Sequence, residues 1–550
     1  MEEKTLEQSA DVKNGVKRMV FAGIAILLEL ALVLLIILRF NESAEGVAIG
    51  TRIMGTLLVL LIYNSNQTSA MKMPWIILIM LAPVLGVALY LMMGLNGSTW
   101  KMRLRYEAVD KALFRHLGDG EEALARLDAV DRRAANIARY VRHGSGYPLY
   151  DDTAITYYDD ASTGLEAQKE ALRKAEKFIF MEYHAIEDAE SWHGIQKILE
   201  ERVAAGVRVR VFYDDMGSIG FINTDFVKRL EAKGIQARVF NPMAPGLNLF
   251  LNNRDHRKIT VVDGKVGFTG GYNLANEYFN VTHPFGRWKD TGVRLEGPAV
   301  RSLTVAFLEM WNAVSDKDVD DHNFDRWLPK VSPVPDTTGF VMPYADTPMD
   351  QEQVGEDVYI SVAEYAKEYA WYITPYLILT DEMVHALGLA AKRGVDVRII
   401  TPGIPDKKLV YSITRSYYHS LVRNGVRIFE YTPGFCHCKM CVSDDMVATC
   451  GTINLDYRSL YHHFENGCLY CACKAVMDTK ADFEATMAEC REVTADYANP
   501  GAGMRLTQLV LRLFAPLLSG YRRHAGNRHT TAYDVPAPLG KTTKLGPARL

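Results

Sequence analysis

A strand–helix–strand pattern that occurs twice constrains this 550-residue chain more than any other feature. Residues 177–184 and 206–214 are apolar and β-branched runs typical of strands, and a helical stretch separates them. The same layout returns at residues 369–376 and 394–401. Because strands joined by a crossover helix pair in parallel, each copy predicts an α/β lobe. We therefore expect two related lobes with mixed, largely parallel sheets flanked by helices, rather than a short-period solenoid.

The duplication divides the chain into segments of different character, as expected for a chain too long for one ordinary core. A first lobe is predicted over residues 151–311 and a second over 349–500, with a proline-bearing connection at 312–348. The other predicted segments are a membrane anchor at 1–100, a charged helical connector at 101–150, and an amphipathic helix with a basic tail at 501–550.

Apolar runs are concentrated in the first hundred residues. Residues 19–38 and 74–95 are long enough to cross a bilayer, whereas 47–63 is shorter and carries Arg52. Two or three transmembrane helices are therefore predicted. Basic residues flank both ends of this block, and the positive-inside rule then favours an even number of crossings with both ends in the cytoplasm. We accordingly expect a multi-pass membrane protein whose lobes are cytoplasmic.

Composition excludes several classes of protein. The chain has 62 Lys and Arg against 66 Asp and Glu, a net charge of −4, which argues against a nucleic-acid partner. A hydrophobic content of 48% excludes a disordered chain. All eight cysteines lie between Cys436 and Cys490, unlike those of a disulfide-stapled scaffold. Their spacing is not that of a zinc knuckle, and strand alternation sends Cys441 to the opposite face from Cys436, so ordinary thiols and no metal are expected.

The same short motif, HxKxxxxD, occurs once in each predicted lobe. Each copy begins a β-branched run and is followed by an asparagine fifteen residues after its lysine. Because the His and Lys are two residues apart on a strand, they project from one face. Each motif aspartate starts a turn, so it serves either backbone geometry or the chemistry. The candidate residues are His256, Lys258, Asp263 and Asn273 in the first copy, and His437, Lys439, Asp444 and Asn454 in the second.

Two histidines and two lysines at one seam between paired lobes are the groups that cleavage of a phosphodiester requires. One imidazole attacks phosphorus and the other protonates the departing alkoxide. The lysines and asparagines neutralise the phosphoryl oxygens, so neither a metal nor another cofactor is expected. Isolated His and Lys residues are more often surface or core residues, but the duplication disfavours that interpretation here.

The doubled motif with its trailing asparagines resembles the phospholipase D superfamily, and within it the bacterial cardiolipin synthases. Residues 253–258 and 451–459 look like the segments around the family's first and second motifs, and residues 374–376 and the apolar N-terminus also fit. Two positions depart from the family pattern: His463, where asparagine is frequent, and Cys438, where a small residue is usual.

This resemblance implies a transphosphatidylation in the bacterial cell membrane. Two phosphatidylglycerol molecules give cardiolipin and glycerol through a phosphatidyl-histidine intermediate. The resemblance favours His256 as nucleophile and His437 as general acid and then base, although the symmetry of the sequence also allows the reverse. The alternatives are a phospholipase D hydrolase, another phosphatidyltransferase such as phosphatidylserine synthase, a nuclease, which the spans and the mild acidity disfavour, and a catalytically silent lipid-binding membrane protein.

A nucleophilic histidine needs a carboxylate to fix its tautomer. Alignment of the two lobes puts Asp290 and Glu465 at equivalent positions after the two motifs. We therefore predict that Asp290 orients His256 and that Glu465 orients His437. Glu277 is a second candidate in the first lobe.

The C-terminal segment carries a second membrane feature. It has a one-sided apolar stripe, with Arg505, Gln508 and Arg512 on the other side, followed by a basic tail. An interfacial helix with a tail that binds an anionic membrane surface fits these features, and a helix packed on the lobes fits them equally. Phosphatidylglycerol and cardiolipin in the bilayer are the expected partners. The stripe consists of Leu506, Leu509, Val510, Leu513, Phe514 and Leu517.

Overall fold

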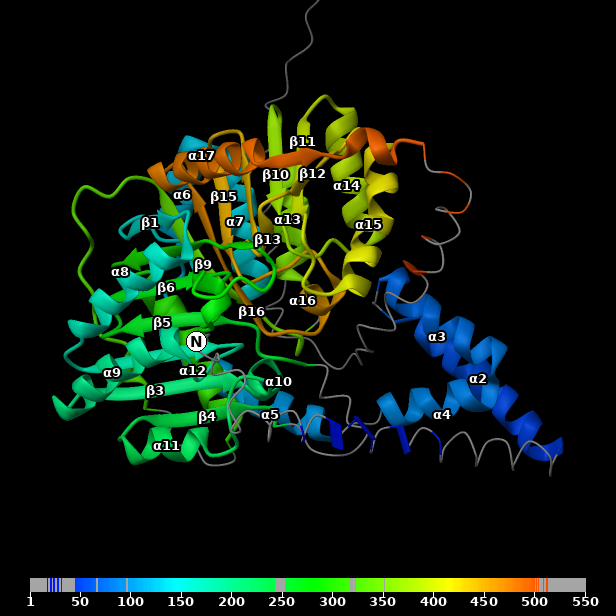
Figure 1. The fold of residues 1–550 in the computed structure, drawn as a ribbon, viewed down its shortest axis with the longest axis horizontal. Helices are drawn as coiled ribbons and strands as arrows, with labels where there is room; N and C mark the ends of the chain where they lie inside the picture. The colour runs from blue at the N-terminus through cyan, green and yellow to red at the C-terminus, as the bar shows by residue number, and fades with distance from the viewer. Residues whose placement is uncertain are drawn as a thin grey trace, which may run out of the picture.

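Two β-sheets with helices packed against them form the body of the molecule, and the helices of residues 45–94 project to one side (Figure 1). The computed structural model describes residues 45–499 with short gaps, together with single residues of 17–31 and 501–512. The gaps are residues 66–67, 95–96, 243–252, 316–319, 321–322 and 351.

The first lobe contains strands β1 (Ala154–Tyr158), β2 (Phe178–Tyr183), β3 (Arg208–Asp214), β4 (Gln236–Phe240), β5 (Lys258–Val262), β6 (Val266–Gly270), β7 (Arg287–Lys289) and β8 (Gly292–Glu296), and helices α8 (Ala161–Arg173), α9 (Glu190–Ala204), α10 (Asp215–Ser218), α11 (Phe226–Ala232), η3 (Asn276–Phe279) and α12 (Val300–Ala313). Its seven-stranded sheet has the order β1-β8-β6-β5-β2-β3-β4. Successive side chains of β2 lie on opposite faces of the sheet. Phe180 belongs to the core on the side of α12, and Ile179 belongs to the core on the side of α8 and α9.

The second lobe contains strands β9 (Phe340–Asp346), β10 (Tyr369–Ile373), β11 (Asp396–Pro402), β12 (Arg427–Tyr431), β13 (Gly434–Cys436), β14 (Met440–Ser443), β15 (Val447–Gly451), β16 (Glu465–Cys471) and β17 (Cys490–Glu492), and helices η4 (Asp325–Trp327), α13 (Val354–Tyr365), α14 (Asp381–Lys392), α15 (Lys408–Val422), α16 (Tyr457–Tyr461), α17 (Lys474–Ala488) and η5 (Thr494–Tyr497). Its eight-stranded sheet has the order β9-β16-β15-β14-β10-β11-β12-β17. Apart from β17, this order repeats that of the first sheet, strand for strand.

Both sheets are mixed, but the prediction that they are largely parallel is wrong. Only β2-β3-β4 and β10-β11-β12 are parallel, among the pairings within the two described sheets. The motif strands turn back instead: β5 pairs with β6, and β14 with β15, in antiparallel hairpins. Asp263 and Asp444, at φ 54° and 49°, form the tight turns that close these hairpins.

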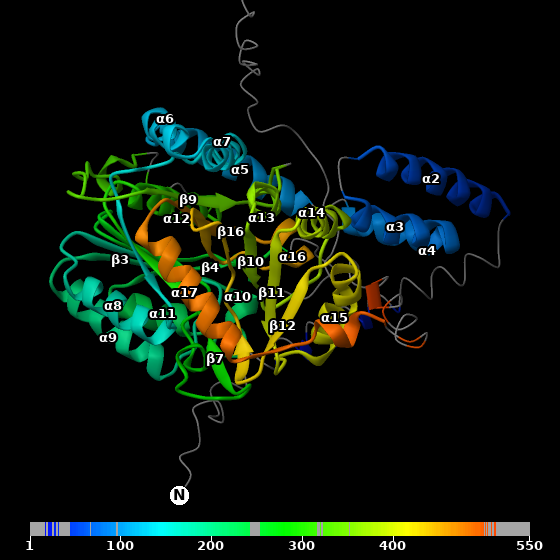
Figure 2. The ribbon, with the colours of Figure 1, turned by 90° about the horizontal axis from the view of Figure 1, so that it is seen from above.

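The two lobes interlock. Strand β9 lies within the predicted connection, yet it is the edge strand of the second sheet, so that lobe begins before residue 349. The last long helix of each lobe contacts the first strand of the other. Helix α12 packs on β9, near which it is labelled in Figure 2, and α17 packs on β1. The two lobes therefore pack against one another and are not separate domains joined only by a linker.

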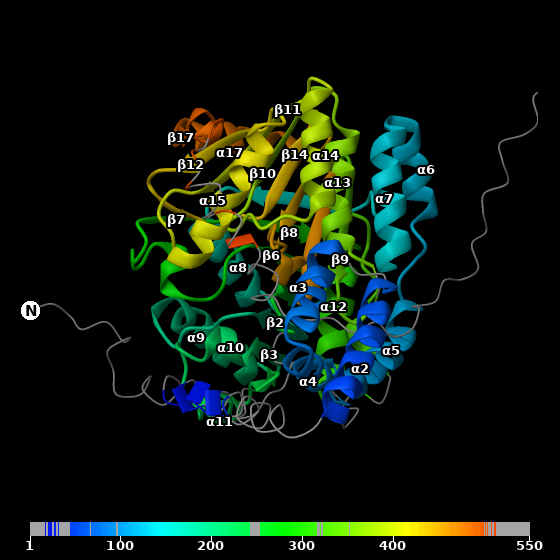
Figure 3. The same ribbon diagram turned by 90° about the vertical axis from the view of Figure 1, so that its right-hand side faces the viewer.

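Residues 97–145 form the helical connector, as α5 (Gly97–Phe114), α6 (Glu121–Val130) and α7 (Arg132–Ser145). Helix α5 packs on α12, and α7 packs on α13, beside which it lies in Figure 3. Buried side chains of the connector, such as Tyr106 and Leu113, belong to the same hydrophobic core as both sheets. The connector therefore contributes to the core that the two lobes share.

The predicted membrane spans are not supported by the helices that the structure describes. The described part of the predicted span at 74–95 belongs to two helices, α3 (Ser69–Leu81) and α4 (Pro83–Gly94), because the chain breaks at Ala82, immediately before Pro83. Gly86 lies so close to Ile79 that a Cβ there would fall 2.6 Å from the Ile79 Cα, and α3 and α4 pack together. Among the described residues, no helix combines the length and apolar character that crossing a bilayer requires.

The other membrane predictions fall partly or wholly on undescribed residues. Helix α2 (Glu45–Tyr63) corresponds to the marginal second span, whereas most of residues 19–38 lie outside the described residues. So do all six residues of the C-terminal stripe and the whole basic tail. Within that segment, Arg512 packs on α15: its Nη2 donates to the Ser416 carbonyl at 2.7 Å, and its guanidinium lies over the Tyr417 ring. This contact fits the alternative of a helix packed on the lobes.

Candidate active site

The two motifs lie at equivalent places in the two sheets, at the start of β5 and of β14. Lys258 opens β5 and Lys439 precedes β14, and each histidine stands two residues before its lysine. All four side chains are buried, with exposed fractions of 7% for His256, 2% for Lys258, 5% for His437 and 1% for Lys439. Of the four residues only Lys258 lies within a strand, so the prediction that each His–Lys pair lies on a strand is wrong for both histidines and for Lys439, which directly precede the strands.

Each histidine is hydrogen-bonded to a carboxylate from the opposite lobe. His256 Nδ1 lies 2.9 Å from Glu465 Oε2, and His437 Nδ1 lies 2.7 Å from Asp290 Oδ2. The prediction that Asp290 orients His256 and Glu465 orients His437 is therefore wrong in its pairing, although both carboxylates do contact a motif histidine. The crossed bonds bring both motifs to one seam between the lobes.

The backbone explains the crossing. The His256 N–H donates to the carbonyl of Phe464, directly before Glu465, at 2.9 Å. In the same way, the His437 N–H donates to the carbonyl of Lys289, directly before Asp290, at 2.8 Å. Strands β7 and β13 extend this contact as a parallel pair across the lobes. The residue after each carbonyl thus reaches the other lobe's histidine.

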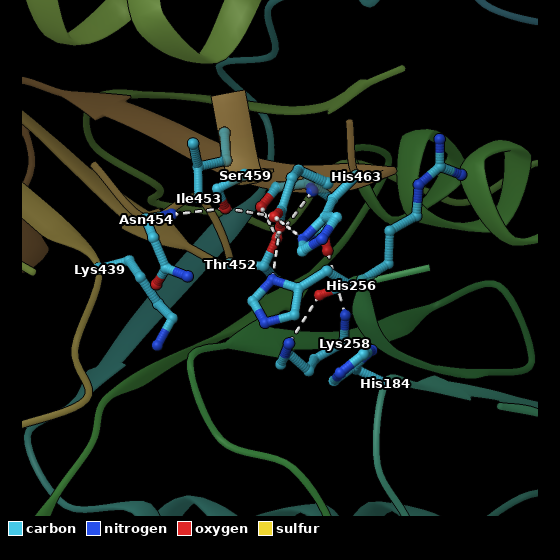
Figure 4. Close-up of polar contacts among 12 residues, drawn as sticks. His184, His256, Lys258, Lys439, Thr452, Ile453, Asn454, Ser459 and His463 are labelled. Carbon is cyan, nitrogen blue, oxygen red and sulfur yellow. Dashed lines mark hydrogen bonds and ion pairs between the residues drawn. The ribbon is translucent and has the colours of Figure 1, made fainter. Parts of the chain in front are cut away.

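The site contains two buried lysine side chains, one from each motif. Burial lowers the pKa of Lys258 to about 7 and that of Lys439 to about 8, against the raising effect of nearby carboxylates, and each ammonium also repels the other motif's groups. Lys258 Nζ donates to the His256 carbonyl at 2.6 Å, and Lys439 Nζ donates to that of His437. Figure 4 shows Lys439 and Asn454 from the second lobe beside His256 and Lys258 from the first. Such a pocket favours an anion.

Their surroundings lower the pKa of both histidines, which favours the neutral imidazole. Burial, followed by the charge of Lys258, holds the pKa of His256 well below its usual range. Burial and Lys439 lower the pKa of His437 to about 4, even though Asp290 raises it. For Asp290, burial raises the pKa, but the interactions with His437 outweigh it and leave the pKa below its usual range. A neutral imidazole whose Nδ1–H donates to a carboxylate presents a lone pair on Nε2, as a nucleophile or base needs.

Glu465 is itself held firmly. Burial raises its pKa well above the usual range, against the charge of Lys258. The hydroxyl of Thr452 donates to its Oε2 and that of Ser459 to its Oε1. These two hydroxyl groups, which sequence reasoning missed, fix the carboxyl plane beside His256. The pattern GT…S around the second motif is their only sequence signal.

The two asparagines fill different roles. Asn273 Oδ1 accepts from the Ala185 N–H at 3.1 Å and its Nδ2 donates to the Tyr278 hydroxyl at 2.8 Å, so its polar atoms are engaged by protein. Asn454 Oδ1 is buried without a hydrogen-bond partner. Asn454 therefore differs from Asn273 in that its carboxamide oxygen, an acceptor, is left without a protein partner.

Asp263 and Asp444 belong to the scaffold. Asp263 accepts three backbone N–H groups at the start of β2, from Glu176, Lys177 and Phe178 at 2.7–2.8 Å. Asp444 accepts the three equivalent N–H groups at the start of β10, from Lys367, Glu368 and Tyr369. These contacts support the backbone interpretation of the two aspartates, and their place among the catalytic candidates stays a prediction.

Glu277, the second orienting candidate, does not take that role. It lies in η3, and the Nδ1 atoms of both motif histidines are bonded to Asp290 and Glu465 instead.

Two further imidazoles flank His256. The His184 ring, directly after β2, is centred 5.0 Å from the His256 ring, and its Nδ1 is bonded to the Asp255 carbonyl at 2.7 Å. The His463 ring is centred 5.5 Å away on another side (Figure 4). The sequence marks His463 as a departure from the family pattern, whereas nothing local marks His184, since its distance from the motif is 72 residues.

The cysteines are thiols, as expected. All eight are free, and Cys436 and Cys438 are buried with their sulfurs 4.0 Å apart. Cys438 Sγ donates to the Lys289 carbonyl at 3.5 Å, on the seam. As for metal ligands, His256, His463 and Glu465 form a group among the described residues whose ligand atoms lie within 4.8 Å of one another.

Comparison with known protein families gives two matches. A family described as "Cardiolipin synthase, PLD-like domain" matches residues 169–311 and 359–487, which contain the two motifs. A second family, described as "Phospholipase_D-nuclease N-terminal", matches residues 54–94.

Several proteins resemble most of the chain. An uncharacterised protein from Streptococcus mutans is 41% identical over 461 residues, 84% of this chain and 99% of that protein. Proteins named cardiolipin synthase from Geobacillus kaustophilus and Halalkalibacterium halodurans are 32% and 30% identical, over 84% of this chain and 91% of each. The crystal structure of phosphatidylserine synthase from Haemophilus influenzae shares the fold, with a TM-score of 0.51 and 13% identity over 70% of this chain and 98% of that one.

Proposed function

The chain belongs to the cardiolipin synthase family with phospholipase D-like domains, and from this premise we propose that it transfers the phosphatidyl group of one phosphatidylglycerol to another. The products are cardiolipin and glycerol. The observation that carries the proposal is the pair of crossed His–carboxylate bonds, which joins both motifs into one buried cationic site. A phosphodiester anion between two lysines is the charge complement of that site.

The first half-reaction uses His256 as the nucleophile. Its Nε2 attacks phosphorus while Glu465 accepts the Nδ1–H bond and stabilises the positive charge that develops on the ring. The bond between phosphorus and the glycerol oxygen breaks, and His437 gives its proton to that oxygen. The anionic substrate raises the proton affinity of His437, whose pKa is otherwise low, so that Nε2 takes up a proton from solvent as the substrate binds. This is the proton that His437 transfers to the leaving oxygen.

The second half-reaction reverses the roles. The glycerol hydroxyl of a second phosphatidylglycerol gives its proton to His437, its oxygen bonds to phosphorus, and the bond to His256 Nε2 breaks. Lys258, Lys439 and the Asn454 amide stabilise the charge on the phosphoryl oxygens in both steps. Burial of the site favours a lipid alcohol over water as acceptor.

Membrane association follows from the family, and we propose that the lobes stand on its cytoplasmic side with α2 to α4 in contact with lipid. Apolar side chains on α2 and α3 are exposed, including Ile53, Leu57 and Leu61 on α2 and Met80 on α3. In vesicle flotation, a Leu57→Asp/Leu61→Asp variant should bind lipid more weakly than a Lys111→Asp control on α5. Equal flotation of the two variants would contradict this contact.

The activity is tested by incubating the full-length protein in detergent with phosphatidylglycerol vesicles and separating the lipids. Cardiolipin with an equal amount of glycerol is the expected result. Phosphatidic acid as the main product would instead indicate a hydrolase, and no turnover of any phosphatidyl donor would overturn the enzymatic assignment. His256→Ala and His437→Ala variants should both abolish cardiolipin formation.

The nucleophile is tested with a phosphatidyl ester of p-nitrophenol, because this leaving group needs no proton. His437→Ala should still release one equivalent of p-nitrophenolate in a burst and retain a covalent lipid, whereas His256→Ala should not. The opposite pattern would assign the nucleophile to His437.

A further inference from the structure

His463 gives the nucleophile an unusual neighbour. One ring nitrogen of His256, one ring nitrogen of His463 and one carboxylate oxygen of Glu465 all lie within 4.8 Å of one another. His463 Nδ1 is 3.6 Å from Glu465 Oε1, and His256 Nδ1 is 2.9 Å from Glu465 Oε2. Both ring nitrogens of His463 are buried, and neither has a hydrogen-bond partner in the structure. Figure 4 shows the His463 ring beside the Nδ1 edge of His256.

We propose that this cluster binds a transition-metal ion of the zinc class, with His256 Nδ1, one nitrogen of His463 and the carboxylate of Glu465 as ligands. Two imidazoles and one glutamate are a common zinc ligand set, and a fourth position stays open for water. The ion displaces the proton of the hydrogen bond between His256 and Glu465, so that binding one ion releases one proton. No oxidation or reduction is involved.

The surroundings supply the outer contacts of such a site. Thr452 and Ser459 hold the two oxygens of Glu465 through their hydroxyl groups, as the partners of a metal-bound carboxylate do. The charges of Lys258 and Arg458 oppose a cation here. The site therefore selects ions that bind imidazole strongly, Zn²⁺ and Cu²⁺, over Mg²⁺ and Ca²⁺, which require oxygen ligands.

Binding inhibits the transfer reaction, a consequence that rests on the proposed function. A metal on Nδ1 withdraws electron density from Nε2, the attacking atom, and it removes Glu465 from its role as the partner of the Nδ1–H. The ion thus competes with catalysis without occupying the phosphate pocket. Replacement of His463 by a residue that is not a good metal ligand relieves this inhibition.

Binding is tested on metal-stripped full-length protein in detergent, with Co²⁺ as a spectroscopic probe and Zn²⁺ as competitor. Wild type should bind one Co²⁺ with visible absorption of an imidazole-ligated site, reversed by Zn²⁺. His463→Asn and His463→Gln should weaken Zn²⁺ binding by about tenfold or more. The matched control is His193→Asn, an exposed histidine on α9, which should bind as wild type does. Equal Zn²⁺ affinity in wild type and in a folded His463 variant would overturn the site.

Inhibition is tested separately, as the ratio of each variant's cardiolipin-forming rate with and without Zn²⁺. Wild type and His193→Asn should lose activity at Zn²⁺ concentrations where the His463 variants retain theirs. Zn²⁺ binding at His463 without loss of the wild-type rate would overturn the inhibitory role and count against His256 as nucleophile. Absence of the transferase reaction in every metal-free sample would count against the proposed function. In that case the Co²⁺ measurement alone would decide whether the metal site exists.

Discussion

At the scale of single residues, the crossed carboxylates assign a distinct role to each side chain of the site. Glu465 acts on the histidine of the first motif and Asp290 on that of the second. The sequence predicts the participants but not the partners, because Asp290 and Glu465 occupy equivalent positions in both copies. Only the backbone contacts across the seam break this symmetry.

The crossing predicts opposite phenotypes for the two carboxamide variants. Glu465→Gln should disable the nucleophile and suppress the p-nitrophenolate burst, because the amide offers the wrong hydrogen bond to Nδ1. Asp290→Asn should spare that burst and instead slow the release of glycerol, which needs an acid. We expect losses of about 10³- to 10⁴-fold in the affected step. If Asp290→Asn lost the p-nitrophenolate burst and Glu465→Gln kept it, the result would instead support the pairing within lobes, in which Asp290 orients His256.

A pH dependence follows from Lys439, whose pKa burial lowers to about 8. Each ammonium of the site binds the phosphodiester while it is charged, and the pKa of Lys258 is lower still, about 7. The KM for phosphatidylglycerol should therefore begin to rise above pH 7, as Lys258 loses its proton, and rise more steeply above pH 8, as Lys439 does too. Bound substrate raises the pKa, so kcat should change less. The titratable groups facing Lys439 are Asp290, Glu465, Cys436, Cys438 and Lys258.

Lys439→Arg is the matched variant for this measurement, because a guanidinium remains charged throughout the range. Its KM profile should be flatter above pH 8 than that of wild type. Superimposable profiles would mean that Lys439 does not titrate in substrate binding.

At the scale of elements, the hairpins that carry the motifs are fastened by their own aspartates. Asp263 joins the β5–β6 turn to three N–H groups before and within β2, and Asp444 repeats this at β10. The spacing of the HxKxxxxD motif therefore reflects two demands: chemistry at its start and strand register at its end.

Asp263→Ala should destabilise the fold more than it impairs the chemistry. The variant loses three charge-assisted hydrogen bonds and puts an alanine at a positive φ, which alanine disfavours. Together these effects should lower the free energy of unfolding by about 3 kcal/mol. The kcat of the folded fraction should stay within severalfold of wild type. Asp263→Asn, which keeps an acceptor and tolerates this φ, should lose less stability. A kcat loss as large as that of His256→Ala in folded Asp263→Ala protein would contradict the scaffold role.

Helix α5 is coupled to the first motif through Arg257, between His256 and Lys258. Arg257 Nη2 donates to the Tyr106 hydroxyl at 3.0 Å, and that hydroxyl donates to Glu309 at 3.0 Å. Tyr106→Phe leaves a buried guanidinium donor without its acceptor, which should cost about 1–3 kcal/mol in unfolding free energy and lower kcat. Thermal unfolding and initial rates measure both effects. Tyr63→Phe, at an exposed hydroxyl on α2, should change neither.

At the scale of the whole molecule, the internal repeat was sufficient to predict two α/β lobes and the common seam. It was not sufficient to predict the antiparallel hairpins, since a strand–helix–strand pattern describes only the parallel half of each sheet. The contacts of α12 and α17 with the other lobe were also hidden, because helix periodicity does not identify the surface on which a helix packs. His184 was missed for the same reason: its proximity to His256 exists only after β2 and β5 pair.

The lobes are also joined by a buried ion pair. Asp482 on α17 accepts from Lys289 at 2.6 Å and from the Tyr157 hydroxyl at 2.6 Å, so one carboxylate binds two residues of the first lobe. Asp482→Ala removes the carboxylate from both donors. Lys289 Nζ keeps the Asp159 carbonyl and the Tyr157 hydroxyl keeps the Met440 sulfur as acceptors, so the variant should lose about 1–3 kcal/mol in the free energy of unfolding. Because the Lys289 carbonyl accepts from His437, kcat should fall as well. Retention of wild-type stability and rate would show that the seam does not depend on this pair.

The exchange of carboxylates also bears on how such a molecule can arise or be divided. A half-length polypeptide with one motif would carry a histidine and a carboxylate that cannot serve each other, because each points across the seam. It would gain a complete set only by associating with a second half in a twofold arrangement, which is also the way the two sheets repeat their strand order. Fusion of the two halves into one chain replaces association of two molecules by an intramolecular contact. It also allows the two motifs to diverge in sequence and to take different roles in the reaction.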